Sequence, residues 1–385
     1  MIYWDYNATA PVRHLVKAKV IEALESFSGN PSSPHALGQS SRAYIEGVRR
    51  RLCEKIGLKP SDLVFCASAT EANWMALWGH WFYEKKIAKQ EGRKPKKLLV
   101  GALEHASIEK NLSSLTELEG TEVLKIPLQK NGLVDLKATE KLLAENSFFL
   151  VSLHAACNET GIIQPWQEVA KICQTYKVHF HSDLVQFLGR IPLNLSDVPV
   201  SSGTLAFHKC GGLKGIGAFF IRHSEWIPPL AGGSQEKKRR AGTENVLGIA
   251  SIDALTEELD QIISSYQGPV AKLRDQFEAR LREKIPHVKI VGEEIPRLPN
   301  TSFCVFPGVP ADAMLMSLDV ANICSSAGSA CSSGLAEGSS KLLELGYSKE
   351  DAQCGVRFSL GESAHSDDID KIISVIDKTI KRMAA

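Results

Sequence analysis

No run of this 385-residue sequence is apolar for long enough to span a bilayer, and it contains no low-complexity tract or internal repeat. Net charge is also nearly absent: 45 Lys and Arg residues against 44 Asp and Glu residues give a formal charge of +1. This balance gives no electrostatic basis for binding nucleic acid or an anionic membrane surface. The N-terminal stretch MIYWDYNATAP has no basic segment followed by an apolar one, so we expect no secretion signal and a cytoplasmic location.

The sequence has no C-x-x-C pair, although it contains nine cysteines. They stand at positions 53, 66, 157, 173, 210, 304, 324, 331 and 354. A zinc or redox pair defined by local spacing is therefore not expected, and we predict no metal site. An odd, scattered set without a secretion signal is typical of reduced thiols in a cytosol-like compartment, where most cysteines pack as small hydrophobic residues.

Residues 60–225 alternate between short apolar runs and helical patterns, which favours a doubly wound α/β domain. The runs are nearly continuously apolar, as parallel strands require when helices cover both faces of their sheet. They are LVFCA (63–67), LLVGA (98–102), FFLVSLHAA (148–156), VHFHSD (178–183) and TLAFH (204–208). Between the first two runs the spacing predicts a helix over 70–88, with Thr70 as its N-cap.

The pattern changes near residue 255, where we predict a long charged helix over 254–284. The segments VKIVG and NTSFCVF follow, then a cysteine-containing loop, RFSLG and a final helix near 366–383. A chain of this length exceeds the size at which one hydrophobic core keeps growing, so we expect two domains. We predict a large α/β domain over 14–255 and a smaller α+β domain formed by 1–13 and 256–385.

Polar residues follow the predicted strands at their carboxyl ends, where open α/β sheets bind ligands. Asp183 and Gln186 follow one strand, and His208 and Lys209 end the next. A buried carboxylate and a buried lysine at adjacent strand ends are costly unless they are used, although a structural ion pair would also explain them. A lysine can form a Schiff base with a carbonyl cofactor, and an aspartate can hold a pyridinium nitrogen. With a phosphate site at the helix start near Thr70, where a simple N-cap is the alternative, these residues suggest pyridoxal 5′-phosphate.

Two further patterns carry less weight. His179, His181 and Asp183 alternate along one strand and would share a face, so a metal site is conceivable, but no further ligand cluster accompanies them. The stretch GGLKGIG (211–217) is glycine-rich, but it lacks the spacing and context of a nucleotide-binding loop.

Eleven short motifs together give the sequence a resemblance to the cysteine desulfurases of the class V aminotransferase-like family, in the group whose catalytic loop reads S-S-G-S-A-C. They are DYNATAP (5–11), GNPSSPHALG (29–38), SATEANWMA (68–76), LEHASI (103–108), CNETG (157–161), HSDLVQ (181–186), HK (208–209), KGIGA (214–218), RRAGTENV (239–246), SSAGSACSSG (325–334) and VRFSLG (356–361). The resemblance covers essentially the whole chain and is specific, because all the motifs occur in the family's order. It implies the aspartate aminotransferase-like fold of pyridoxal-phosphate transferases, with pyridoxal 5′-phosphate as cofactor and L-cysteine as substrate.

The resemblance implies that five residues hold or contact the cofactor ring. Lys209 would carry the cofactor as a Schiff base, and Asp183 would hold the ring nitrogen. Gln186 would donate to the phenolate oxygen, His105 would stack over the ring and Val185 would pack beneath it.

The resemblance also implies contacts to the cofactor phosphate and the remaining cofactor surface. Thr70 and His208 would contact the phosphate, and in a homodimer Thr243 of the partner subunit would reach it across the interface. Ala69 and Asn158 are the other implied cofactor contacts.

The resemblance also implies which residues bind the substrate and which residue accepts its sulfur. Arg357 would bind the substrate α-carboxylate through its planar fork, assisted by Asn158 and Asn30. Cys331, in a loop at about 322–336, would take the substrate sulfur as a persulfide, and His105 would handle the proton of the substrate thiol. A loop of Ser, Gly and Ala gives Cys331 the reach to pass this sulfur to an acceptor protein, for iron–sulfur cluster assembly or for thiolation of RNA or a cofactor.

Three features depart from the family pattern. Ala206 stands three residues before Lys209 where the family has a hydroxyl residue, which removes one phosphate donor. Leu184 replaces a smaller residue beside Asp183 and is expected to crowd the site. The chain ends in KRMAA without the longer tail of scaffold-dedicated members, which leaves the acceptor open. The alternatives are a related lyase or transaminase on the same fold, such as a selenocysteine lyase, and a non-catalytic paralogue that acts as a binding partner.

Overall fold

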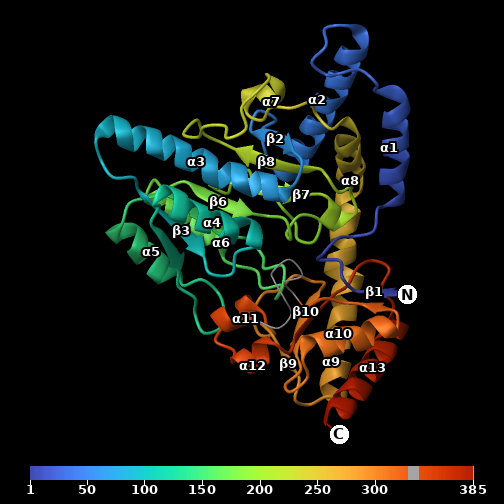
Figure 1. The fold of residues 1–385 in the computed structure, drawn as a ribbon. Helices are drawn as coiled ribbons and strands as arrows, with labels where there is room; N and C mark the ends of the chain where they lie inside the picture. The colour runs from blue at the N-terminus through green and yellow to red at the C-terminus, as the bar shows by residue number, and fades with distance from the viewer. Residues whose placement is uncertain (328–337, 385) are drawn as a thin grey trace.

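The computed structural model describes residues 1–327 and 338–384, and its centre is a seven-stranded sheet (Figure 1). The strands are β2 (Leu63–Cys66), β3 (Lys97–Gly101), β4 (Val123–Ile126), β5 (Phe148–Ser152), β6 (Phe180–Asp183), β7 (Ser202–Ala206) and β8 (Gly217–Ile221). Their order across the sheet is β2-β8-β7-β6-β5-β3-β4. Strand β8 is antiparallel to both of its neighbours, and the other neighbouring pairs are parallel. The predicted mainly parallel α/β sheet is confirmed.

The sequence identifies five of these strands because they are buried on both faces and therefore apolar. Every residue of β2, β5 and β7 is buried. The other two were not predicted. Strand β4 lies at the edge of the sheet and buries only Ile126, while β8 directly follows a glycine-rich stretch that resembles a loop.

Helices before residue 266 surround this sheet. They are α1 (His14–Ser26), α2 (Ala36–Ile56), α3 (Ala69–Glu91), α4 (Ala106–Glu119), α5 (Leu136–Glu145), α6 (Trp166–Thr175), α7 (Gln235–Lys238) and α8 (Val246–Ser265). Neighbouring residues of β3 show that both faces are covered: Val100 packs with Trp81 of α3 and Ile108 of α4, whereas Leu99 belongs to the largest core cluster on the opposite face. The sheet is therefore doubly wound, as predicted.

The start of α3 differs from the prediction in one detail. Its N-cap is Ser68, whose hydroxyl accepts the backbone N–H of Glu71 at 3.1 Å. The assignment of the cap to Thr70 is wrong, because Thr70 already lies in the first turn of the helix.

The C-terminal part contains two small sheets and five helices in the residues that the structure describes. A three-stranded antiparallel sheet has the order β12-β10-β9, and β1 pairs in parallel with β11. The strands are β1 (Ile2–Tyr3), β9 (Lys289–Ile290), β10 (Thr301–Val305), β11 (Ile323–Cys324) and β12 (Gly355–Ser359). The helices are α9 (Ala271–Lys284), α10 (Ala311–Val320), α11 (Ser340–Glu344), α12 (Lys349–Ala352) and α13 (Ser366–Ala384). The pairing of β1 with β11 brings the N-terminus into this part of the molecule.

One long helical segment connects the two parts (Figure 1). Helix α8 packs on α1 and α2, a π-helical turn, η2 (Tyr266–Val270), follows it, and α9 continues to pack against α13. The predicted helix over 254–284 is confirmed, although it begins earlier, at Val246. The predicted domain boundary at 255 falls inside α8 and stays a prediction.

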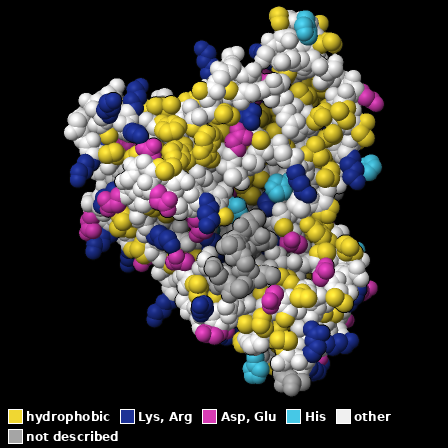
Figure 2. Space-filling view, in the orientation of Figure 1, with side chains coloured by type: hydrophobic (Ala, Val, Ile, Leu, Met, Phe, Trp, Pro, Cys, Tyr) yellow, Lys and Arg dark blue, Asp and Glu magenta, His cyan; other side chains and the backbone are white. Residues whose placement is uncertain are grey.

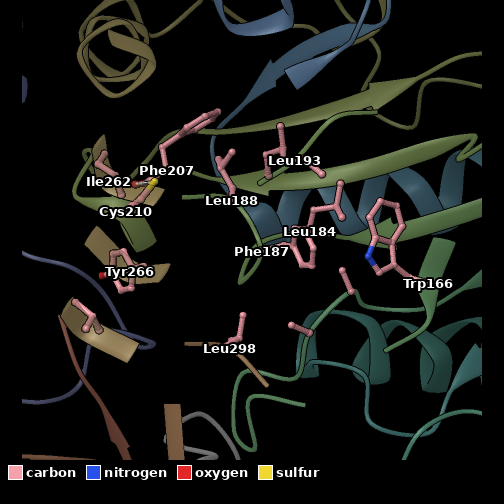
Figure 3. Packing of buried hydrophobic residues seen from close by; sticks show 14 of the residues in the cluster. Trp166, Leu184, Phe187, Leu188, Leu193, Phe207, Cys210, Ile262, Tyr266 and Leu298 are labelled. Atoms are coloured by element: carbon pink, nitrogen blue, oxygen red, sulfur yellow. Dashed lines mark hydrogen bonds between the residues drawn. The ribbon is translucent and has the colours of Figure 1, made fainter. Parts of the chain in front are cut away.

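Leu184 lies in the largest hydrophobic cluster, together with Trp166, Phe187 and Leu193 (Figure 3). Its side chain is fully buried there. The expectation that Leu184 crowds the site is wrong, because the residue that follows Asp183 packs into the core.

The molecular surface agrees with the balanced composition. On the face shown in Figure 2, Lys and Arg side chains are interspersed with Asp and Glu. Within the described residues, no helix is both long enough and apolar enough to cross a membrane.

Candidate active site

The candidate site lies at the carboxyl ends of the parallel strands. His105 follows β3, Asn158 follows β5, Asp183 ends β6 and Lys209 follows β7 in the short 3₁₀ helix η1 (His208–Cys210). Because β3, β5, β6 and β7 are consecutive parallel neighbours, these residues share one edge of the sheet. The sequence prediction that Asp183 and Lys209 end adjacent strands is confirmed.

Lys209 is partly buried and donates from Nζ to the carbonyl oxygens of Asn7 at 2.8 Å and Ala8 at 2.7 Å. Burial, helped by the positive charges of Arg190 and Arg357, lowers the pKa of Lys209 from 10.5 to about 8. A lysine with such a pKa supplies a substantial fraction of neutral amine near neutral pH, which is the form that attacks a carbonyl.

Asp183 is buried and held by two donors. Asn73 donates from Nδ2 to Oδ2 at 2.8 Å, and the backbone N–H of Val185 donates to Oδ1 at 2.9 Å. Both donors hold the carboxylate in one orientation. The neighbouring Glu104 feels this charge: burial first, and then Asp183, raise the pKa of Glu104 to about 8.

His105 caps α4, and its orientation is set by Ser107. The backbone N–H of Ser107 donates to Nδ1 of His105 at 3.1 Å, and the Ser107 hydroxyl lies 2.8 Å from the same atom. Nδ1 is therefore an acceptor, and the neutral ring carries its proton on Nε2. Burial is the largest cause that lowers the pKa of His105, so the neutral form prevails near pH 7.

Asn73 links these groups into one buried network. Its Nδ2 donates to Ser107 Oγ at 2.8 Å as well as to Asp183, and its Oδ1 lies 3.2 Å from His181 Nε2. His181 Nδ1 in turn lies 3.0 Å from Ser202 Oγ, and burial lowers the pKa of His181 to about 3. His181 is thus a neutral donor to Asn73, which fixes the amide orientation that serves Asp183.

The N-terminal segment forms another side of the site. The carbonyl oxygen of Asn7 accepts from Gln186 Nε2 at 3.1 Å in addition to Lys209. The Asn7 side chain donates to the carbonyl oxygen of Asn158 at 3.1 Å and to Thr301 Oγ1 at 2.9 Å. Asn7 therefore joins residues from both parts of the molecule around Lys209.

Arg357, in β12, reaches the same network. It donates from Nη1 to the carbonyl oxygen of Asn158 at 2.9 Å and from Nη2 to Asp5 Oδ1 at 2.6 Å. Its Nε is buried and has no partner in the described part of the chain. A buried guanidinium with a spare N–H group suits a further carboxylate ligand.

The predicted phosphate contacts lie beside this network. Ala69 and Thr70 open α3, and their backbone N–H groups are not used by the cap, which engages Glu71. His208 Nδ1 lies 3.1 Å from Thr9 Oγ1, and burial lowers the pKa of His208 to about 4. Ala206 is buried and pairs with Gly217 of β8, so it brings no hydroxyl group to this position.

Other predicted residues are not brought together with this network. Asn30 is exposed, and its Oδ1 accepts the backbone N–H of Ser32. Thr243 is exposed ahead of α8. Cys331 lies outside the described residues, whereas Cys324 ends β11 and is partly buried.

The metal site that strand alternation made conceivable is not formed. His181 belongs to the Asn73 network, whereas His179 lies against Glu225, with Nε2 to Oε2 at 2.6 Å. Within residues 1–327 and 338–384, no group of three or more His, Cys, Asp or Glu side chains could hold a metal ion.

A mainly parallel sheet with an aspartate and a lysine at adjacent strand ends defines the class of pyridoxal-phosphate enzymes of fold type I. The comparison with protein families gives the narrower assignment: residues 2–372 match Aminotransferase class-V. The chain belongs to this family, whose cofactor is pyridoxal 5′-phosphate.

Known proteins are similar to this chain over nearly its full length. The chain is 34% identical to "Cysteine desulfurase IscS" of Dictyoglomus turgidum over 99% of this chain and 95% of the relative, and 34% identical to "Cysteine desulfurase" of Nostoc sp. over 100% and 94%. Among solved structures, a NifS-like protein from Rickettsia africae aligns with a TM-score of 0.86, at 33% identity over 99% of each chain.

The residues of this site fit pyridoxal phosphate. The lowered pKa of Lys209 suits imine formation, and Asp183 is fixed as an acceptor for a ring nitrogen. The N-terminus of α3 carries two N–H groups that the cap does not engage and that suit a phosphate, and Gly217 leaves this helix start open, because a Cβ there would meet Ser68 and Ala69 at 2.8 and 3.0 Å.

Sequence reasoning missed several residues that build the site. Asp5, Asn7, Asn73 and Arg190 all contact predicted site residues, and none of them was assigned a role. Asp5 and Asn7 do stand in the motif DYNATAP, and Arg190 follows Gln186 at the spacing of one helical turn, so both signals were present.

Proposed function

We propose that this protein is a pyridoxal-phosphate-dependent cysteine desulfurase, which converts L-cysteine to L-alanine and holds the sulfur as a persulfide on Cys331. The observation that carries this proposal is the Lys209 amine, which shares the Asn7-centred network with Arg357 through Asn158. A base and a carboxylate-binding group are thus joined at one sheet edge. Full-length relatives named cysteine desulfurase support the choice of substrate.

Pyridoxal phosphate, when bound, supplies an aldehyde that condenses with amines and a ring that draws electrons from the substrate α-carbon. Lys209 would hold it, Asp183 would accept its ring N–H, and Gln186 would donate to its phenolate oxygen. With a pKa of about 8, the Lys209 amine can also take the α-proton of the substrate near neutral pH.

Arg357 would orient the substrate through its carboxylate. Two of its five N–H groups are engaged by Asn158 and Asp5, which fix the plane of the guanidinium. The remaining donors include the unpartnered Nε, and burial strengthens their attraction to a carboxylate. We assign the side chain of Asn158 to assist there, because Asn30 is exposed and is not brought together with this network.

His105 and Cys331 would act on the sulfur. His105 carries its ring proton on Nε2, so this is the atom through which it would exchange a proton with the substrate. The Cys331 thiolate would attack the substrate sulfur. A sulfur–sulfur bond forms as the carbon–sulfur bond breaks, and the released electron pair stays on the substrate carbon, which takes up a proton to become the methyl group of alanine.

The described residues on either side of the Cys331 segment lie beside the site. Ser326 pairs with Arg357 through two backbone hydrogen bonds of 3.1 and 2.6 Å, and the Ser339 hydroxyl donates to Glu159 at 2.7 Å. Cys331 follows Ser326 by five residues, so a fully extended chain limits its distance from Ser326 to about 17 Å. This limit supports the assignment of Cys331 as the sulfur-accepting residue.

We further propose a cytoplasmic homodimer in which Thr243 of the partner subunit completes the phosphate site. The exposure of Thr243 in the single chain supports this arrangement. The persulfide would pass to a sulfur-acceptor protein, for iron–sulfur cluster assembly or for thiolation of RNA or a cofactor. Sedimentation of the wild type and loss of cofactor affinity in Thr243→Ala test the dimer.

The direct test incubates purified protein with L-cysteine and a reductant and measures sulfide and alanine. We expect the wild type to release both, and Cys331→Ser to keep the cofactor absorbance while losing sulfide. The matched control is Cys324→Ser, because Cys324 is also a free cysteine close to the same segment, and it should remain active. Normal turnover by Cys331→Ser would refute the assigned sulfur acceptor.

A second arm replaces L-cysteine with L-selenocysteine. A selenocysteine lyase would release selenide from this substrate without needing Cys331, whereas a non-catalytic paralogue would act on neither substrate. Turnover of selenocysteine alone would contradict the proposed function.

A further inference from the structure

Arg190 is a fully buried cation that has no carboxylate partner among the residues the structure describes. It donates instead to carbonyl groups: to the main chain of Gln186 at 3.2 Å, of Tyr6 at 3.1 Å and of Lys209 at 3.4 Å. Its fourth acceptor is the Gln186 side chain, with Nη1 to Oε1 at 2.7 Å. Burying a charge without a counter-charge is costly, so a role for the charge is indicated.

The π-helical turn between α8 and α9 holds Arg190 in place. The guanidinium carbon lies 5.8 Å from the ring centre of Tyr266, within the range of a cation–π contact. Gln267 donates from Nε2 to the Arg190 carbonyl oxygen at 2.6 Å. The extra residue of a π turn shifts the helix face, and here it presents both side chains to Arg190.

One consequence concerns the direction of the Gln186 amide. A guanidinium has only donors, so the Gln186 atom that faces Arg190 must be the carbonyl oxygen. Nε2 then points the other way and donates to the carbonyl oxygen of Asn7, which leaves its second N–H for another acceptor. A flipped amide would place two donors against each other.

A second consequence concerns the charge around Lys209. Burial is the largest cause of the lowered pKa of Lys209; after it, Arg190 and Arg357 disfavour protonation of the amine, and Asp183 and Asp5 favour it. Asp5 is paired with Arg357, whereas Arg190 is surrounded by carbonyl groups and the Tyr266 ring and has no carboxylate partner in the described part of the chain.

We propose that Arg190 is a positioning residue, which fixes the Gln186 amide with its N–H groups towards the site and, as a buried cation bonded to the Lys209 carbonyl oxygen, disfavours protonation of the Lys209 amine. This inference rests on the assignment of Lys209 and Gln186 to the cofactor in the proposed function. It is testable without the reaction, because both effects exist in the chain itself.

The first test measures the pKa of Lys209 in the cofactor-free full-length protein. Trace labelling with acetic anhydride from about pH 6 to about pH 11, read by mass spectrometry of the Lys209 peptide, follows the neutral amine. Arg190→Met removes the charge and Arg190→Lys keeps it. Arg222→Met is the matched control, because Arg222 also donates to main-chain carbonyl groups, those of Val198 and Leu195.

We expect Arg190→Met to raise the pKa of Lys209 by about one unit, a tenfold loss of neutral amine at neutral pH. Arg190→Lys and Arg222→Met should shift this pKa by less than about 0.3 unit. The proposal is overturned if Arg190→Met matches Arg222→Met, or if Arg190→Lys matches Arg190→Met, which a purely structural role would produce. Should Arg190→Met fail to fold, Arg190→Gln makes the same comparison.

The second test asks whether Arg190 acts through Gln186. Dissociation constants for pyridoxal 5′-phosphate are measured for Arg190→Lys, Gln186→Ala and the double variant. We expect each single change to weaken binding about fivefold, and the double variant to be no weaker than about tenfold. If the effects of the two substitutions on the dissociation constant multiply in the double variant, the positioning role is overturned. Neither test uses cysteine, so a failure of the proposed desulfurase activity leaves both results interpretable.

Discussion

Replacing Asn73 with alanine should destabilise the protein far more than an ordinary asparagine change. The Asn73 side chain is fully buried and makes three hydrogen bonds, to Asp183, Ser107 and His181. Asn73→Ala leaves one carboxylate oxygen and one imidazole N–H without these partners in a buried region.

The magnitude follows from these unpaired groups. A buried neutral group left without its partner costs about 1–3 kcal/mol, and a charged one costs more. Counting Asp183 and His181, we expect Asn73→Ala to lower the free energy of unfolding by about 4 kcal/mol. Asn111 is the matched control: its amide also makes two hydrogen bonds, to Trp78 and to the Ser107 carbonyl oxygen, but it is only partly buried. Because water can replace these partners, we expect Asn111→Ala to cost about 1 kcal/mol.

Urea unfolding of the cofactor-free protein measures both values, with equal m-values required for the comparison. A double-mutant cycle of Asn73→Ala with Asp183→Asn then isolates the charged hydrogen bond, for which we expect a coupling of about 1.5–3 kcal/mol. If Asn73→Ala costs no more than Asn111→Ala, or if the cycle shows additive effects, the argument that Asn73 fixes Asp183 is refuted.

Three further changes test the buried charges and the packing. Lys209→Met should stabilise the cofactor-free protein at pH 7 by up to roughly 3 kcal/mol in urea unfolding, because the folded-state pKa of about 8 lies below the unfolded value of 10.5. This advantage should shrink as the pH rises from about 8 to about 10.5, because in this range the unfolded wild type binds more protons than the folded wild type, so that the wild type gains stability with pH. Equal free energies of unfolding for the two proteins at pH 7 would contradict the reasoning. Arg49→Met leaves the buried Glu236 carboxylate without its charge partner and should lower the free energy of unfolding by about 3–5 kcal/mol in the same assay. Adding Glu236→Gln should recover part of this loss, and strictly additive effects of the two substitutions would argue against the pair. Gly79→Ala should lower thermal stability by about 1–3 kcal/mol, since its Cβ would overlap the Trp226 indole, and an unchanged melting temperature would rule out this clash.

The sequence predicts the edge of the sheet that holds the candidate site because the residues that mark it follow directly on the strands. Asp183 directly ends an apolar run, Lys209 ends the next, and the carboxyl ends of neighbouring parallel strands must meet. Strand β8 escaped prediction because a glycine-rich stretch precedes it, and the antiparallel direction of β8 depends on pairing with β2, far away in the chain.

The partners of Asn73 and Arg357 could not be predicted because these contacts are long-range. Asn73 lies 110 positions from Asp183, and Arg357 lies 352 positions from Asp5. In the sequence Asn73 stands in the motif SATEANWMA, and Arg190 follows Gln186 by four residues. Only the packed structure shows that one is the centre of a network and that the other is a buried cation.

The placement of the N-terminal segment has a consequence for how the protein is made. Asn7 is translated before the segments that anchor it, because β1 pairs with β11 and the backbone N–H of Tyr6 bonds to the carbonyl oxygen of Ser359. The groups that hold Lys209 therefore stay unanchored until residue 359 has been translated. Pyridoxal 5′-phosphate should consequently bind only after these segments have been translated. Stalled nascent chains that end before residue 355 should not retain the cofactor.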